Sequence, residues 1–329
     1  MADTPEGPHD AVIVGSGAGG AMAAYMLTKA GASVLMLEAG RDYDPTQAAM
    51  MSPPWEAPLR GQGTADKDFG YFDATVDGGW SVPGEPYTVA DGSEFKWWRA
   101  RMLGGRTNHW ARNSFRMGPY DFKPHTRDGI GVDWPIGYQD LAPWYDRVEK
   151  LVGVYGENSG LENHPNSGPG SLLPAPKFRA WESFLKAGGD DLGIPVVPAR
   201  RAVLSRKIDE REQCFWASGC GRGCGIGAAF QTTTSLLPWA RKTGKLDLVT
   251  DAMVYEVMLD KSGKASGVRY IDKKTGAHRE AKGRVVVLAA STGETARILL
   301  NSKPNGRSEG LANSSGQVGR NLCDTVGSS

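Results

Sequence analysis

Three of the four cysteines lie close together in a stretch rich in glycine. Cys214, Cys220 and Cys224 fall within the segment EQCFWASGCGRGCGIGAAF, whereas Cys323 lies near the end of the chain. Glycine lets a short loop curl so that its thiolates converge on one centre, and the amides of such a loop can donate hydrogen bonds to sulfur. The pattern therefore predicts a metal or cluster site at the three clustered cysteines, with Cys323 as a packing residue.

The spacing of these cysteines bears on which metal they would hold. Structural zinc sites usually take four ligands at spacings of about two to four residues. Here five residues separate the first two cysteines, three separate the last two, and no histidine follows nearby. Three thiolates without a near fourth ligand favour a [3Fe-4S] cluster over zinc. Buried structural thiols or a disulfide remain alternatives.

A glycine turn is the second group of residues that could bind a cofactor. Its motif G-x-G-x-x-G consists of Gly15, Gly17 and Gly20. Such glycines let the chain turn sharply and let a pyrophosphate approach the N-terminus of the following helix. Glu38 follows eighteen residues after Gly20, where an acid accepts hydrogen bonds from a ribose. An acid at this position disfavours NADP, but the motif fits FAD and NAD equally.

A third segment, GGRTNHW, begins with the glycine pair Gly104 and Gly105. Two adjacent glycines remove the Cβ atoms that would hold the backbone away from a ligand, so this segment is suited to pass close to a flat ring. The polar residues that follow are Thr107, Asn108 and His109. A histidine at such a place can also be an ordinary hydrogen-bonding or packing residue.

The segments around these motifs predict a sheet with helices. Apolar residues 11–14 predict a buried parallel strand, residues 21–30 predict a helix, and Glu38 ends a second strand. A helical segment is expected over residues 232–243. Further strands are expected at residues 246–250, 254–260, 265–272 and 283–290, with the turns DKSG and DKKTG between the last three. The order predicts a strand–helix–strand start, a long irregular middle and a return to strands that complete the first sheet.

The irregular middle has two segments of unusual composition. Residues 41–95 are rich in Pro, Gly and Asp, and they are predicted to be extended cover loops. Residues 157–175 are rich in Pro, Gly, Asn and Ser, and they are predicted to be a linker. The later part of WPIGYQDLAPWYDRVEKLVGVYG, which lies between them, has helical spacing.

Composition limits the possible partners. The 329 residues include 38 basic and 37 acidic side chains, so no general attraction to nucleic acid or anionic lipid is expected. The first eight residues, MADTPEGP, contain no signal peptide pattern, and no apolar run is long enough to span a bilayer. Taken alone, the sequence predicts a cytoplasmic protein with an ample core, since 40% of its residues are hydrophobic.

The motifs together resemble the glucose-methanol-choline (GMC) family of FAD-dependent oxidoreductases. The resemblance covers nearly the whole chain and rests on VIVGSGAGGAMAAYMLTKAGASVLMLEAG, RMLGGRTNHWARNSFR, DWPIGYQDLAPWYDRVEKLVGVYG, GVRYIDKKTG and GQVGRNLCD, in this order. It implies FAD rather than NAD. It also implies an α/β fold, the FAD-binding Rossmann-like GMC (PHBH-type) fold, incomplete at the C-terminus and with parts of a second substrate domain.

The resemblance also implies roles for single residues. The glycine loop is similar to that of the subgroup containing pyranose 2-oxidase, which implies a covalent bond from His109 to the flavin 8α-methyl group. Asn108 is then a candidate to contact the polar edge of the isoalloxazine. Val254 occupies the place where the family sets a backbone against adenine, although it can also be an ordinary strand residue.

The cysteine segment is similar to that of the catalytic subunit of bacterial FAD and [3Fe-4S] sugar or glucoside 3-dehydrogenases. This implies electron transfer from the flavin through the cluster to a c-type cytochrome. It further implies a small companion subunit that carries the export signal for both chains. The protein would then be periplasmic, despite the absence of a signal peptide from this chain.

The family's catalytic base is a histidine with a histidine or asparagine partner near its C-terminus. None of the five histidines here sits in such a motif: His9, His109, His125, His164 and His278. The last residues of the chain resemble a mid-chain segment of the family. We therefore predict that the catalytic pair is absent from this chain, and we assign no catalytic residue.

The predicted domains are the first part of the FAD-binding domain with the flavin loop (1–155), an excursion with the cysteine cluster and substrate-domain or cap elements (156–235), and the truncated second part of the FAD-binding domain (236–329). The predicted function is a dehydrogenase that oxidises a sugar or glycoside hydroxyl by hydride transfer to FAD. The alternatives are an inactive fragment that binds nucleotide weakly or not at all, and an NAD-linked reductase.

Overall fold

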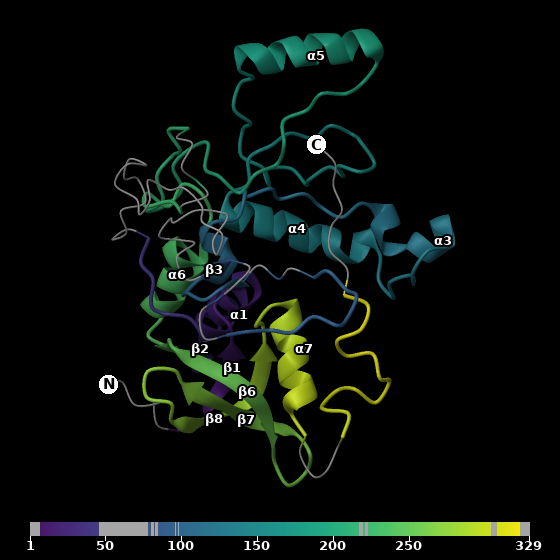
Figure 1. The fold of residues 1–329 in the computed structure, drawn as a ribbon. Helices are drawn as coiled ribbons and strands as arrows, with labels where there is room; N and C mark the ends of the chain where they lie inside the picture. Colours follow the sequence, from purple (N-terminus) through teal and green to yellow (C-terminus); the bar gives the residue numbers. More distant parts are fainter. Residues whose placement is uncertain are drawn as a thin grey trace. The chain divides into compact units, whose positions relative to one another are not determined.

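The computed structural model describes residues 7–45, 78–79, 82, 85–95, 97, 99–216, 220, 223–303 and 308–322 (Figure 1). Most of the predicted cover loops and Cys323 lie outside these residues. The chain divides into two compact units. The first unit is Met1–His109 with Gln231–Ser329, and the second is Trp110–Phe230. The change of unit therefore comes directly after the flavin loop, whereas the domain boundaries after residues 155 and 235 stay predictions.

One six-stranded sheet forms the first unit, in the order β5-β2-β1-β8-β7-β6. Its strands are β1 (His9–Val14), β2 (Val34–Leu37), β5 (Leu246–Val249), β6 (Ala252–Leu259), β7 (Ala265–Asp272) and β8 (His278–Leu288). β5, β2, β1 and β8 are parallel neighbours, whereas β6, β7 and β8 pair antiparallel. The predicted strands are thereby confirmed, and β8 begins five residues earlier than predicted. A separate small ribbon pairs β3 (Gly78–Gly79) with β4 (Arg99–Ala100).

Helices accompany this sheet. They are α1 (Ala18–Lys29), α6 (Leu236–Lys242) and α7 (Thr292–Asn301), with the short 3-10 helices η3 (Gly105–Asn108) and η6 (Thr232–Thr234). α1 packs on α6, where the rings of Tyr25 and Trp239 lie 5.6 Å apart, and α7 packs on β6 (Figure 1). The apolar side chains of β1 and β2 are buried, as expected for parallel strands covered on both faces. The predicted helices at residues 21–30 and 232–243 are confirmed.

The outer edge of β6 and the last residues of β8 differ in how their backbone groups are paired. The outer edge of β6 is covered, because Ser302 Oγ accepts a hydrogen bond from Val257 N at 2.8 Å and Arg297 donates to Val254 O at 3.1 Å. Residues 283–288 of β8 pair with β1 on one side. No described strand pairs with their other side, and Val285 is 54% exposed.

The second unit contains η4 (Pro119–Phe122), α3 (Pro124–Asp128), α4 (Tyr138–Val152) and α5 (Ala180–Leu192). Its apolar core consists of Tyr155, Leu173, Val203, Leu204 and Ala229. Buried Arg116 binds α4 through a bidentate ion pair with Glu149, with N···O distances of 2.8 and 2.6 Å. Asp146 accepts a further bond from the same guanidinium at 2.5 Å. A buried carboxylate is thus compensated by one arginine.

We predict that Arg116→Met lowers the free energy of unfolding of the second unit by about 3–5 kcal/mol, because Glu149 is left buried without its counter-charge. The exposed pair of Lys186 and Asp190, with an N···O distance of 3.0 Å, supplies the control. Lys186→Met should change the free energy by less than about 1 kcal/mol. Urea unfolding followed by tryptophan fluorescence measures both, and equal effects of the two variants would contradict the prediction.

Candidate functional site

The glycine turn between β1 and α1 has two glycines that the protein itself requires. Gly15 has a φ of +98°, and a Cβ built on it would lie 2.4 Å from the carbonyl oxygen of Ala289. A Cβ on Gly20 would lie 1.9 Å from the carbonyl oxygen of Gly15. No side chain fits at either place, so these two glycines allow the sharp turn and the close approach of helix and strand.

Gly17 is different, because a Cβ built on it meets no atom of the described residues within 4 Å. It is the N-cap of α1, whose first backbone N–H groups have no partner within the helix. The protein therefore does not need glycine here for its own packing. An open approach to a helix N-terminus suits the pyrophosphate of a dinucleotide, which would be crowded by a side chain at this point.

Glu38 directly follows β2 and lies beside the glycine turn. Its Oε2 accepts hydrogen bonds from the Ser16 hydroxyl and, at 3.0 Å, from the Ser16 N–H. Its Oε1 accepts from Gly40 N at 2.8 Å. A carboxylate has about four acceptor positions, so three bonds from the protein leave one for a ribose hydroxyl. The predicted ribose acceptor is thus held in one orientation by its neighbours.

The flavin loop meets the glycine turn. Gly104 and Gly105 both have positive φ, at +85° and +52°, which favours glycine. The N–H of Gly104 donates to Ser16 Oγ at 2.8 Å. A Cβ on Gly105 would lie 4.0 Å from Gly17 Cα. The structure therefore brings together two motifs that the sequence placed 88 residues apart.

Threonines complete this contact. Thr107 donates to Gly104 O at 2.6 Å and accepts from Thr232 N at 3.2 Å. Thr232 in turn donates to Ser16 O at 3.1 Å. Of these residues the sequence predicted Thr107 but not Ser16 or Thr232. The only signal for Thr232 is the run of hydroxyl residues TTTS before α6, a pattern that also marks an ordinary helix start.

Asn108 and His109 follow in the same loop. Asn108 is fully buried, donates to Leu103 O at 2.8 Å and accepts from Thr233 Oγ1 at 3.0 Å. Its amide therefore fixes the shape of the loop, and its contact with the isoalloxazine stays a prediction. His109 is half-buried at the end of η3, and its covalent bond to the flavin also stays a prediction.

Val254 lies in β6 with its side chain in the main core. Its carbonyl accepts from Arg297, as described above, and a register shift with β7 follows between Val254 and Glu256. The side chain is explained by packing alone. A backbone contact with adenine at this irregular point stays a prediction.

The cysteine segment belongs to the second unit. Cys214 and Cys224 pack against the same apolar core, and each sulfur accepts a backbone N–H: Trp216 donates to Cys214 Sγ at 3.2 Å, and Ala229 donates to Cys224 Sγ at 3.4 Å. Cys220 stands between residues 217–219 and 221–222, which are outside the described part of the chain. The three described cysteines form no disulfide.

The described residues contain no group of three or more His, Cys, Asp or Glu side chains placed to hold a metal ion. The hydrogen-bond donors around the cysteines nevertheless suit thiolates. Buried Arg211 donates to Gly227 O at 2.8 Å and to Val152 O at 2.6 Å. Burial lowers its pKa to about 10, while the charges of Cys224 and Asp209 act in the opposite direction. A metal site at the three cysteines therefore stays a prediction.

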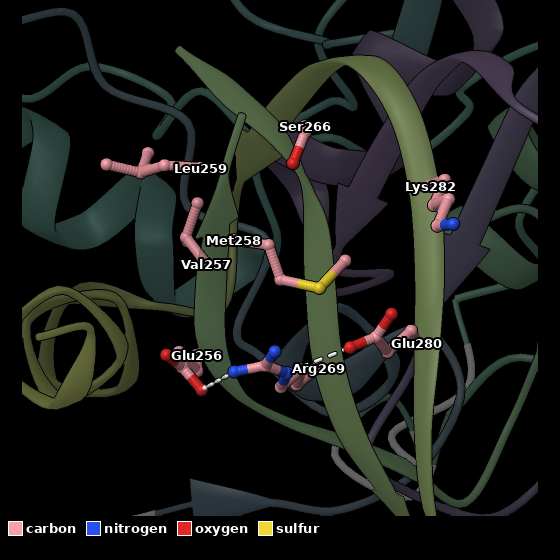
Figure 2. Close-up of a pocket in the computed structure, with 8 residues that line it drawn as sticks. All are labelled: Glu256, Val257, Met258, Leu259, Ser266, Arg269, Glu280 and Lys282. Atoms are coloured by element: carbon pink, nitrogen blue, oxygen red, sulfur yellow. Dashed lines mark hydrogen bonds and ion pairs between the residues drawn. The ribbon is translucent and has the colours of Figure 1, made fainter. Parts of the chain in front are cut away.

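A hollow of about 460 Å³ on the face of β6, β7 and β8 is a second place where a ligand could lie (Figure 2). Arg269 crosses it and pairs with Glu256 and Glu280, each at 3.0 Å. Such exposed ion pairs contribute little to the free energy of unfolding, and they give no sign of a polar group that needs a ligand. Lys282 in its lining precedes Ala289 by seven residues, roughly 23 Å along an extended strand, so the hollow is separate from the glycine turn.

Among the described residues, no helix has both the length and the apolar character needed to cross a membrane.

This chain is similar to known proteins over most of its length. A family model described as GMC oxidoreductase matches residues 9–326. The chain is 33% identical to 2-methyl-1,2-propanediol dehydrogenase of Mycolicibacterium austroafricanum, across 95% of this chain and 54% of that protein. It is 30% identical to the fructose dehydrogenase large subunit of Gluconobacter japonicus, across 97% of this chain and 58% of that protein. The chain thus spans somewhat more than half the length of these relatives.

Among solved structures, pyridoxine 4-oxidase from Mesorbium loti superimposes with a TM-score of 0.54 at 21% identity, over 89% of this chain and 52% of that one. This likeness concerns the fold. Together with the match over residues 9–326, it confirms the predicted fold class. The chain belongs to the GMC oxidoreductase family.

Proposed function

We propose that this chain is the FAD-binding part of a dehydrogenase that oxidises a hydroxyl group of a sugar or glycoside. The observation that carries the proposal is the open space at Gly17, where a pyrophosphate could approach the N-terminus of α1. Glu38 lies beside it, and its carboxylate has one hydrogen-bond acceptor position left for a ribose hydroxyl. The named relatives support the substrate class, because one is a dehydrogenase of a diol and another of fructose. FAD would supply the acceptor for the hydride that leaves the substrate carbon.

The residues of this chain would bind and orient the cofactor. Gly17 and the N-terminus of α1 would receive the pyrophosphate, Glu38 the ribose, and the loop from Gly104 to His109 the flavin. We assign the removal of the hydroxyl proton to no residue of this chain. Three of its histidines form hydrogen bonds with side chains outside the proposed FAD site. His9 lies 2.8 Å from Asp247, His164 2.9 Å from Ser159, and His278 3.1 Å from Tyr255.

The proposal includes an exit for electrons through a [3Fe-4S] cluster at Cys214, Cys220 and Cys224. The amide donors to two of the sulfurs and the buried positive charge of Arg211 support it, because both stabilise thiolates. A cluster would pass single electrons to a c-type cytochrome. A small companion subunit would bring the export signal and a periplasmic location. The relative named as a large subunit supports a multi-subunit enzyme.

A second candidate is that this length of chain binds nucleotide weakly or not at all. One side of residues 283–288 in β8 pairs with no described strand, and this favours the second candidate, since an unpaired strand edge weakens the sheet that carries the glycine turn. Purified wild-type chain distinguishes the two candidates, because bound flavin gives a yellow protein and the second candidate gives a colourless one.

We predict that Gly17→Val weakens FAD binding at least tenfold, because its side chain would occupy the place of the pyrophosphate. The unfolding midpoint should stay close to that of the wild type, since a Cβ there meets nothing within 4 Å in the part of the chain that the structure describes. Gly188→Val in α5 is the matched control, because a Cβ at Gly188 also meets nothing within 4 Å. Flavin fluorescence titration measures the affinities, and full FAD binding by Gly17→Val would refute the proposed site.

We predict that His109 carries the flavin covalently in the complete enzyme. Acid precipitation should then leave the yellow colour in the protein pellet. His109→Ala should release it to the supernatant, whereas a control change at exposed His125 should not. A colourless wild-type pellet would show that the flavin is held without a covalent bond.

We predict that the complete enzyme, purified without oxygen, contains about three iron atoms and four sulfides, with the EPR signal of an oxidised [3Fe-4S] cluster. Cys224→Ser should remove this signal, and Cys323→Ser should retain it. Stoichiometric zinc, or three cysteines that react as thiols in the freshly folded protein, would eliminate the cluster and the reason for a cytochrome partner.

A further inference from the structure

Ser16 occupies a position between the two halves of the proposed FAD site. It is fully buried within the glycine turn. Its hydroxyl contacts both the Glu38 carboxylate and the Gly104 amide, and its backbone contacts Glu38 and Thr232. One side chain therefore joins the proposed ribose acceptor to the first residue of the flavin loop.

The chemistry of these groups fixes the direction of both bonds. An ionised carboxylate only accepts hydrogen bonds, and a backbone N–H only donates them. The single proton of the Ser16 hydroxyl must therefore point to Glu38, which leaves an oxygen lone pair for Gly104. In a buried site each such bond polarises and strengthens the next. The position of Glu38 thus determines how well Ser16 can hold Gly104.

We propose that Ser16 is a positioning residue, which couples the adenosine end of the site at Glu38 to the flavin loop at Gly104. This inference rests on the proposed FAD function and deepens it. A ribose hydroxyl would add a fourth hydrogen bond to the Glu38 carboxylate and restrict its movement further, and Ser16 passes this added order to Gly104. The two ends of FAD then bind cooperatively, because Ser16 joins the carboxylate that would bind the ribose to the loop that would hold the flavin.

ADP is the probe that separates the two ends, because it carries the adenosine ribose and the pyrophosphate but no flavin. Hydrogen exchange at the Gly104 amide is the readout, because this N–H is the donor to Ser16 Oγ. In the wild-type chain, ADP should slow exchange at Gly104. In Ser16→Ala the exchange should be at least tenfold faster without ADP, and ADP should no longer slow it.

Three further variants make the test specific. Ser16→Thr keeps the hydroxyl and should restore the response to ADP, and Ser16→Cys, which keeps the volume but bonds weakly, should lose most of it. Thr233→Val removes a different hydrogen bond of the loop, the one to Asn108 Oδ1 at 3.0 Å. It should speed exchange in the loop and still leave Gly104 responsive to ADP. Either Ser16→Ala or Ser16→Cys suffices if the other does not fold.

The outcomes separate this inference from the function on which it rests. If neither ADP nor FAD binds the wild-type chain, the proposed function fails and the coupling fails with it. If both bind, and ADP slows Gly104 exchange equally in the wild type and in Ser16→Ala, only the role of Ser16 is overturned. A response to ADP that is present in the wild type, Ser16→Thr and Thr233→Val but lost in Ser16→Ala supports it.

Discussion

The proposed cofactor site depends on the two hydrogen bonds of the buried Ser16 hydroxyl. The glycine turn, the end of β2 and the flavin loop come from three separate segments, and Ser16 lies in the first and bonds to the other two. A buried polar group without a partner costs about 1–3 kcal/mol, so all three segments must meet for these groups to be satisfied. The glycines make that meeting possible, because a side chain at Gly15, Gly20 or Gly104 would collide with protein atoms.

Local signals in the sequence were sufficient for the frame of the first unit. The apolar runs in β1 and β2, the glycine turn and the hairpin turns each act within a few residues, so the six strands of the main sheet and the helices α1 and α6 could be predicted with small errors at their ends. The helix α7 and the small ribbon of β3 and β4 were not predicted. The ties that join the motifs could not be predicted. Ser16 and Gly104 are 88 residues apart, and Thr107 and Thr232 are 125 apart. A serine or threonine in a loop carries no local sign of such a distant partner.

The second unit shows the same limit more strongly. Arginine is usually exposed, yet Arg112, Arg116, Arg200 and Arg211 are buried there. Their partners are distant: Arg112 donates to Cys220 O at 2.5 Å, and Arg200 donates to Asn158 Oδ1 at 3.2 Å. The cysteine spacing predicted a cluster from local sequence, and the structure adds amide donors to two of the sulfurs. The convergence of the three sulfurs on one centre stays a prediction.

In the proposed complex, FAD lies across the glycine turn with its pyrophosphate at α1 and its adenosine ribose at Glu38. A crystal structure of the chain with FAD tests it most directly. We expect pyrophosphate oxygens within about 3 Å of the first backbone N–H groups of α1, and a ribose hydroxyl within the same distance of Glu38. Flavin density elsewhere, or a ribose with no contact to Glu38, would contradict it.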